Sequence, residues 1–246
     1  MIIGITEHGD PSIDYAWVNK MALVDGAILI TKNLTDKFMD EILKVKEKVI
    51  LHASCTGYGG TVVEPNLPSY QKQLDNVREL IRRGFPQKQI VVRIDPIIPT
   101  EKGIQLVRSV VEYIQADIKR FRVSVIDMYP HVAKRFTDAN LPLPFEKFQA
   151  TEEQFSALNK ELDTLQKEYG VVFESCAEIF LNAVKQTGCV GKDDIQLLGL
   201  ELDETADSLK GQRPGCLCCS AKSEMLQGLK CDNYGCAYRC LYCYWK

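Results

Sequence analysis

The chain has 246 residues, of which 46% are hydrophobic and 26% are charged, and its formal net charge is −3. These fractions are typical of globular domains and argue against disorder, collagen-like repeats and coiled coils. The slightly acidic balance argues against a broad surface for binding phosphate backbones. No apolar run approaches the roughly 18 residues that span a bilayer, and the opening residues do not resemble a signal peptide, so we expect a cytoplasmic protein.

Short apolar runs, rich in Val, Ile, Leu and Phe, alternate with segments of helical periodicity. The predicted strands are residues 2–5, 27–31, 49–53, 90–94, 121–126 and 171–174. Each run is almost continuously apolar, as expected for strands that are buried on both faces of a parallel sheet. Apolar residues at helical spacing predict helices over residues 35–43, 70–81, 104–114 and 155–169, with Ser69 and Thr151 as N-caps.

Six strand–helix alternations favour one domain, and the absence of GxGxxG after the first strand argues against a nucleotide-binding sheet. We therefore expect an α/β fold, a single parallel (β/α) barrel, complete or partial, of TIM-like type. Two segments interrupt the alternation: residues 134–150 are expected to form an excursion or flap, and the acidic residues 192–211 to run over the surface. The barrel should occupy residues 1–210, and residues 211–246 should form an irregular, Cys-rich tail on its mouth.

Polar residues follow several predicted strands. Because chemistry in parallel barrels gathers at the carboxyl ends of the strands, these residues are candidates for a functional site. They include Asp10, Thr56, Arg93, Asp95, Ser124, Asp127, Glu174 and Glu178.

Cysteine is the unusual feature of the composition. The chain has ten cysteines, and seven of them lie in the last 31 residues. In a reducing compartment such closely spaced thiols indicate soft-metal ligation or redox chemistry rather than disulfides. Cys55 stands apart from them and is predicted to be a small buried residue.

Cys236, Cys240 and Cys243 are separated by three and then two residues. One loop with this spacing can ligate three irons of a cubane [4Fe–4S] cluster and leave the fourth iron open. An open iron is what a small ligand with adjacent amine and carboxylate groups needs.

This triplet, followed by Tyr244, resembles the signature of the radical S-adenosylmethionine (radical SAM) superfamily. In that superfamily the open iron chelates the methionyl part of SAM, and an electron from the cluster releases a 5′-deoxyadenosyl radical that abstracts hydrogen from the substrate. The superfamily usually places this motif after the first barrel strand, whereas here it is almost the last part of the chain.

A C-terminal motif of this kind occurs in the domain-of-unknown-function family 1848, and the resemblance to that family extends along most of the chain. The segments that carry it are residues 10–11, 56–59, 64–69, 93–97, 124–129, 174–178 and 213–218. The chain departs from the family where residues 225–227 replace an Asp-Ile-Gly. Spore photoproduct lyase is similar only as distant kin.

The resemblance implies a set of site residues. Cys236, Cys240 and Cys243 would hold the cluster. The candidates for catalysis are Asp10, Arg93, Asp95, Asp127 and Glu178, and the candidates for binding SAM are Thr56, Tyr58, Ser124, Glu174 and Tyr244. An electron donor of flavodoxin or ferredoxin type is also implied. The substrate is unknown: a nucleotide, a modified base, a DNA lesion or a small metabolite, with nucleic acid not favoured by the charge.

The remaining cysteines leave two alternatives open. Cys176, Cys189, Cys216 and Cys218 also occupy positions of the family pattern, which implies a second site, either an auxiliary [4Fe–4S] cluster or zinc. Alternatively, Cys216 and Cys219, with Cys240 and Cys243, have the spacing of a zinc ribbon. The protein would then be a non-catalytic barrel with a structural or partner-binding tail.

Overall fold

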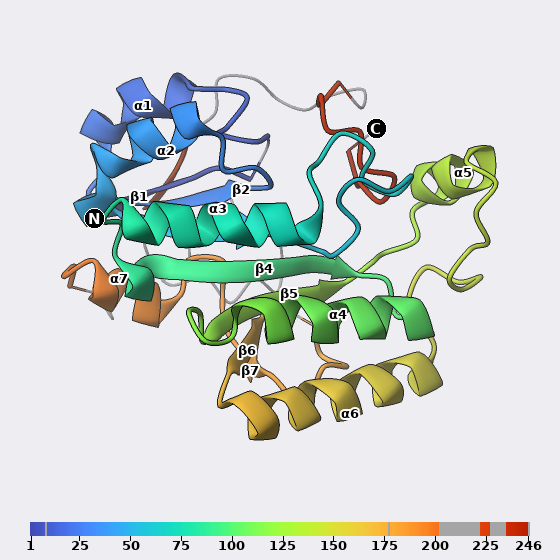
Figure 1. Ribbon diagram of the computed structural model, residues 1–246. Coiled ribbons are helices and arrows are strands. Elements are labelled where there is room, and N and C mark those ends of the chain that lie inside the picture. Colours follow the sequence, from blue (N-terminus) through green and yellow to red (C-terminus); the bar gives the residue numbers. More distant parts are fainter. Residues whose placement is uncertain (8, 177, 202–221, 227–234, 246) are drawn as a thin grey trace.

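The computed structural model describes residues 1–7, 9–176, 178–201, 222–226 and 235–245 (Figure 1). Its centre is a parallel sheet in the order β7-β6-β5-β4-β3-β2-β1-β8. The strands are β1 Ile2–Ile5, β2 Gly26–Thr31, β3 Val49–Ser54, β4 Ile90–Ile97, β5 Arg120–Val125, β6 Val172–Ser175, β7 Lys185–Gln186 and β8 Lys222–Met225. The predicted α/β class is confirmed, and the sheet forms a partial, TIM-like barrel over the described part of the chain.

Helices connect the strands. They are α1 Ala16–Lys20, α2 Asp36–Leu43, α3 Tyr70–Arg82, α4 Glu101–Ile114, α5 Pro130–Asp138, α6 Glu152–Tyr169 and α7 Lys192–Leu197, with short 3-10 turns at η1 Met21–Leu23, η2 Lys46–Lys48 and η3 Gln87–Gln89. Figure 1 shows α3, α4 and α6 side by side along the sheet. The predicted caps are confirmed: Ser69 caps α3, and Thr151 forms a capping box with Gln154 at the start of α6.

The strands are buried on both faces, which explains their continuous apolar runs. In β3, Val49 and Leu51 pack in the core between the sheet and the helices. The alternate residue Ile50 packs with Ile3, Ile28 and Val91 on the inner face of the sheet. Further along β3 the inner face becomes polar, because His52 and Ser54 follow Ile50 at the same alternation.

Two expectations about the interrupting segments need correction. Residues 192–201, the described part of the acidic segment, do not simply run over the surface, since α7 buries both Asp194 and Ile195 completely. The physical reason is that Ile195 packs on the inner face of the sheet and Asp194 pairs with Arg120 at 2.8 Å. Residues 134–150 are not wholly an excursion, because their first residues belong to α5 and Phe145 is buried.

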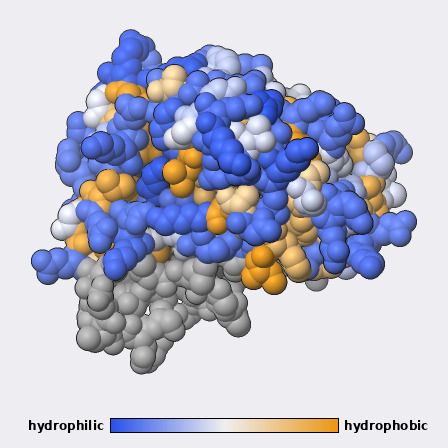
Figure 2. Space-filling model, turned by 90° about the horizontal axis from the view of Figure 1, so that it is seen from below, coloured by the Kyte–Doolittle hydropathy of each residue, from blue (hydrophilic) through white to orange (hydrophobic). Residues whose placement is uncertain are grey.

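The predicted tail also contains a regular element. Strand β8 pairs in parallel with β1 and continues the sheet beyond it. Residues 202–221 and 227–234, which include Cys216, Cys218, Cys219 and Cys231, lie outside the described residues. Among the described helices, none is both long and apolar enough to cross a bilayer. Figure 2 shows a mainly hydrophilic face on which hydrophobic residues are scattered.

Candidate active site

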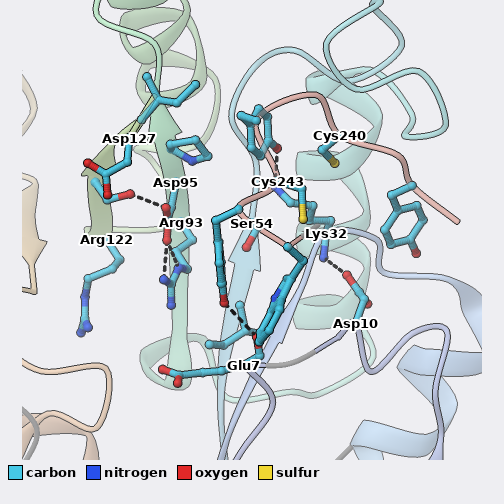
Figure 3. Close-up of a pocket in the computed structure, with 18 of the residues that line it drawn as sticks. Glu7, Asp10, Lys32, Ser54, Arg93, Asp95, Arg122, Asp127, Cys240 and Cys243 are labelled. Carbon is cyan, nitrogen blue, oxygen red and sulfur yellow. Dashed lines mark hydrogen bonds and ion pairs between the residues drawn. The ribbon is translucent and has the colours of Figure 1, made fainter. Parts of the chain in front are cut away.

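A cavity of about 430 Å³ lies at the carboxyl ends of the strands. Its walls come from the ends of β1 to β6 and from the C-terminal loop, residues 235–245 (Figure 3). Figure 1 shows that the C-terminal loop and α5 lie at the same end of the molecule. The cavity has the size and the position expected of a ligand site in a parallel barrel.

The C-terminal loop is held by the loops that follow β1 and β3. The hydroxyl groups of Tyr238 and Ser12 are 2.6 Å apart, which joins the loop to the chain after β1. The backbone N–H of Leu241 donates to the Val63 carbonyl oxygen at 3.0 Å, and the Asn66 amide donates to a carbonyl oxygen of the loop at 2.7 Å. These contacts bring the end of the chain next to the loop after the first strand.

Helix α5 holds the other side of the loop. The Arg135 guanidinium donates to the carbonyl oxygens of Cys243 and Trp245, the latter at 2.6 Å. His131 Nε2 is 2.8 Å from the carbonyl oxygen of Tyr244. Three successive residues of the loop are thus fixed through backbone atoms, which leaves their side chains to line the cavity.

Cys236, Cys240 and Cys243 all line this cavity. Burial raises the pKa of Cys240 to about 12, partly offset by the nearby Lys32 cation, and burial also raises the pKa of Cys243. Such thiols are protonated unless a metal stabilises the thiolate. Soft sulfur donors, shielded from water on one short loop, fit a thiolate-ligated cluster.

Among the described residues, no group of three or more His, Cys, Asp or Glu side chains is placed to hold a single metal ion. Two of the four cysteines with the zinc-ribbon spacing, Cys216 and Cys219, lie outside those residues.

Behind the triplet, Lys32, Glu64 and Tyr242 form a buried network. Lys32 Nζ donates to Glu64 Oε1 at 3.2 Å and to the Tyr242 hydroxyl at 2.6 Å, and Tyr242 donates to Glu64. Burial alone would lower the pKa of Lys32, but the negative charges around it, Glu64 first among them, raise it instead. Lys32 is therefore a fixed cation beside Cys240.

The floor of the cavity carries Arg93 and Asp95 from β4. Arg93 Nε donates to Asp95 Oδ2 at 2.8 Å, and Ser124 of β5 donates to the other carboxylate oxygen. Burial favours the neutral carboxyl group of Asp95, but the Arg93 charge and the hydrogen bonds from Ser124 and Arg93 together outweigh burial, so the pKa of Asp95 is lowered. Figure 3 shows Arg93 and Asp95 close together on β4, beside the C-terminal loop.

Asp10 also lines the cavity, but its carboxylate already has several donors. It accepts hydrogen bonds from Thr31 Oγ1 and from Ser12 Oγ, each at 2.7 Å, and from the backbone N–H of Lys32 at 2.7 Å. Burial still raises the pKa of Asp10. The contacts indicate that Asp10 joins the loop after β1 to the end of β2 and thereby positions Lys32.

Asp127 and Glu178 lie in the wall formed by the ends of β5 and β6. Burial, together with the charges of Asp127 and Asp95, raises the pKa of Glu178 to about 7, although the backbone N–H of Val125 donates to it at 3.2 Å. A carboxyl group with a pKa near neutrality can both give and take a proton. Glu178 therefore has the properties of an acid–base group.

The structure brings most predicted site residues to the cavity. Those that line it are Asp10, Arg93, Asp95, Ser124, Asp127, Glu178, Tyr244, Cys236, Cys240, Cys243, Cys176 and Cys189. Thr56, Tyr58 and Glu174 are buried elsewhere: Thr56 and Tyr58 support the loop after β3, and Glu174 pairs with Arg120 and Arg122. Cys216 and Cys218 lie outside the described residues.

Sequence reasoning missed two residues of the site, Lys32 and Arg122. Lys32 directly follows a buried strand, a position that could have marked it. Arg122 lies inside an apolar run, where a charged residue that alternates with Phe121 and Val123 points to the barrel interior. Tyr242 is one of several tyrosines near the triplet, a pattern that suggests either a cover over the cluster or packing of the loop, but its partners lie about 200 positions away in the sequence and no local pattern predicts them.

A family model described as "Domain of unknown function (DUF1848)" matches residues 13–245. No curated protein matches the chain. Among solved structures, the catalytic domain of a mannanase from Streptomyces sp. SirexAA-E is similar at 14% identity with a TM-score of 0.27, covering 70% of this chain and 73% of that one.

Proposed function

The chain belongs to the DUF1848 family, and we propose that it is a radical SAM enzyme whose [4Fe–4S] cluster is held by Cys236, Cys240 and Cys243. When bound, such a cluster supplies the electron that cleaves SAM to methionine and a 5′-deoxyadenosyl radical, which abstracts hydrogen from the substrate. The electron would come from a flavodoxin- or ferredoxin-type donor.

One observation carries the proposal: the triplet, although it ends the chain, lies next to the loop after β1. The Ser12–Tyr238 contact makes this link. The radical SAM superfamily, which the triplet resembles, places its motif in the loop after the first strand. The C-terminal loop thus reaches the same place in the barrel from the other end of the sequence.

The chain's own residues have distinct roles in this proposal. The network of Lys32, Glu64 and Tyr242 supports the C-terminal loop from behind and keeps water from Cys240. The aromatic residues Tyr244 and Trp245 line the cavity together with the triplet. A dry cavity protects a radical from quenching and influences the potential of a cluster.

For proton transfer, we propose that Glu178 acts as the acid–base group. Its pKa of about 7 suits a group that takes a proton from the substrate or returns one to it. Arg93, Asp95 and Ser124 would orient the polar groups of the bound molecules at the floor. Cys176 and Cys189, in the same wall, would hold an auxiliary site together with Cys216 and Cys218.

The test is anaerobic reconstitution of the protein with iron and sulfide, followed by metal analysis. We expect about four irons and four sulfides per chain for the radical SAM cluster, and more if the auxiliary site is also a cluster. Addition of SAM and dithionite should then yield 5′-deoxyadenosine. A colourless protein with stoichiometric zinc and no iron would refute the proposal and favour the zinc-ribbon reading.

Serine variants of the triplet localise the cluster. Cys240→Ser should lose iron and the visible absorption of the cluster while keeping its fold. The matched control is Cys55→Ala, because Cys55 is a buried cysteine of the core between sheet and helices and does not line the cavity. Equal loss of iron in both variants would contradict the assignment of the ligands.

A further inference from the structure

Arg93 and Arg122 are neighbours across β4 and β5. They are register partners in the sheet, flanked by Ser54 on β3 and Glu174 on β6. Both arginines line the cavity, and Figure 3 shows their guanidinium groups extending in the same direction from neighbouring strands. The floor of the cavity therefore presents two adjacent guanidinium groups.

In each guanidinium, two nitrogen atoms donate to protein acceptors, and the third nitrogen has no acceptor among the described residues. Arg93 uses Nε and Nη2 on Asp95, while its Nη1 is buried with no acceptor among the described residues. Arg122 donates Nη1 to the Gly188 carbonyl oxygen at 2.7 Å and Nη2 to Glu174 at 3.0 Å, and its Nε has no acceptor in the same part of the chain. Arg122 is only 2% exposed, so water does not readily satisfy this donor.

Buried donors without acceptors are rare in folded proteins, and a ligand commonly supplies the missing acceptor. Two fixed guanidinium groups side by side match the geometry of a group with several negative oxygens. Asp95 and Glu174 accept hydrogen bonds from the arginines, and Asp194 lies 3.8 Å from Arg122 Nη2. These carboxylates balance the positive charge, but none of them accepts from Arg93 Nη1 or Arg122 Nε.

We propose that Arg93 and Arg122 bind an oxyanion of the substrate, a carboxylate or a phosphate, at the floor of the cavity. This inference rests on the proposed function and adds the chemical class of the substrate: a small acidic molecule rather than a neutral one. The oxyanion would take the donors at Arg93 Nη1 and Arg122 Nε. Glu7, a carboxylate of the cavity wall whose charge acts on Arg93, faces the same position and opposes an anion there.

The experiment measures anion binding without SAM or turnover. The purified full-length chain is titrated with inorganic phosphate and, separately, with malonate, against potassium chloride at matched ionic strength. At least one of the two should bind saturably, and the tighter one identifies the oxyanion. A response equal to that of potassium chloride for both probes would overturn the proposal.

Variants test whether Arg93 contributes to the anion site. Arg93→Gln should weaken binding about tenfold or more, because a charged hydrogen bond is lost. Arg83→Gln, which removes a surface arginine paired with residues of α2 and α3, should bind like the wild type. Equal affinity in Arg93→Gln and the wild type would contradict the proposal. If Arg93→Gln does not fold, Glu7→Gln decides: tighter binding supports the site, and unchanged binding refutes it.

A competition with SAM separates this proposal from the proposed function. If SAM displaces the probe anion competitively, the arginines hold the carboxylate of SAM, and the substrate assignment is wrong. If the anion binds independently of SAM while no 5′-deoxyadenosine forms under reducing conditions, the anion site stands and the radical SAM function fails.

Discussion

Lys32 and Glu64 form an ion pair that is largely removed from water, with Glu64 only 1% exposed. The pair links the end of β2 to the loop after β3 and, through Tyr242, to the C-terminal loop. Because burial makes a single uncompensated charge expensive, the two residues should behave as a unit rather than as independent contributors to stability.

We expect Lys32→Met to lower the free energy of unfolding by about 3 kcal/mol, because it leaves the Glu64 carboxylate buried without its cation. The double variant Lys32→Met with Glu64→Gln should recover part of this loss. Urea unfolding of the two single variants and the double variant measures the coupling. Strict additivity of the two losses would show that the pair does not interact in solution.

His52 is a second buried titratable residue, completely enclosed on the inner face of β3. Burial lowers its pKa well below the usual value, and the charges of Arg122 and Arg93 lower it further. His52 is therefore neutral in the folded chain, and it takes up a proton only when the chain unfolds in acid. Its contribution to stability is therefore complete above about pH 6.5 and is lost progressively as the pH falls below that value.

His52→Leu should remove this acid sensitivity. Neither ring nitrogen of His52 has a hydrogen-bond partner among the described residues, so an apolar side chain of similar size costs little near pH 8. The difference in unfolding free energy between wild type and variant should change by up to about 1.4 kcal/mol per pH unit below pH 6.5. A difference that is constant from pH 8 to pH 5 would contradict a neutral buried His52.

The junction between α5 and the C-terminal loop fixes the position of the triplet. Arg135 on α5 donates to two carbonyl oxygens of the loop, whereas its neighbour Lys134 is exposed and pairs with Asp138 on its own helix. Replacement of either residue by alanine removes one positive charge from the same helix, so the two variants form a matched comparison.

Arg135→Ala should loosen the loop, while Lys134→Ala should not. We expect faster amide hydrogen exchange over residues 236–245 and a lower iron content after reconstitution in Arg135→Ala, because the backbone of the cysteine loop loses its anchor. The fold of the barrel should be unchanged in both. Similar exchange in the two variants would mean that α5 does not hold the loop.

Sequence reasoning located the elements that are long and uniformly buried. β3 and β4 were predicted because both of their faces are apolar, and α6 because its apolar stripe begins at a capping residue. β7 and β8 were missed because neither has an apolar run: β7 is two exposed residues, and the sequence of β8 is Lys-Ser-Glu-Met. α7 was misjudged since its acidic residues suggested a surface, whereas Asp194 is buried against arginines.

For the whole molecule, most of the site residues predicted from the sequence line the cavity, but their arrangement was not predicted. Strand ends meet at one end of a parallel barrel, so Arg93, Asp95 and Asp127 could be grouped from the pattern alone. The place of the C-terminal loop depends on contacts between opposite ends of the chain, such as Ser12 with Tyr238, and no local pattern predicts these. Thr56 and Tyr58 were predicted to belong to the site because they follow a strand, but they are buried and have a structural role.

The proposed radical SAM function requires a cluster with an open iron that can bind SAM. Electron paramagnetic resonance of the reconstituted protein, reduced with dithionite and recorded with and without SAM, tests this directly. We predict the signal of a reduced [4Fe–4S] cluster whose spectrum changes when SAM is added, in the wild type and in Cys55→Ala but not in Cys240→Ser. A cluster signal that SAM leaves unchanged would contradict an open iron held by Cys236, Cys240 and Cys243.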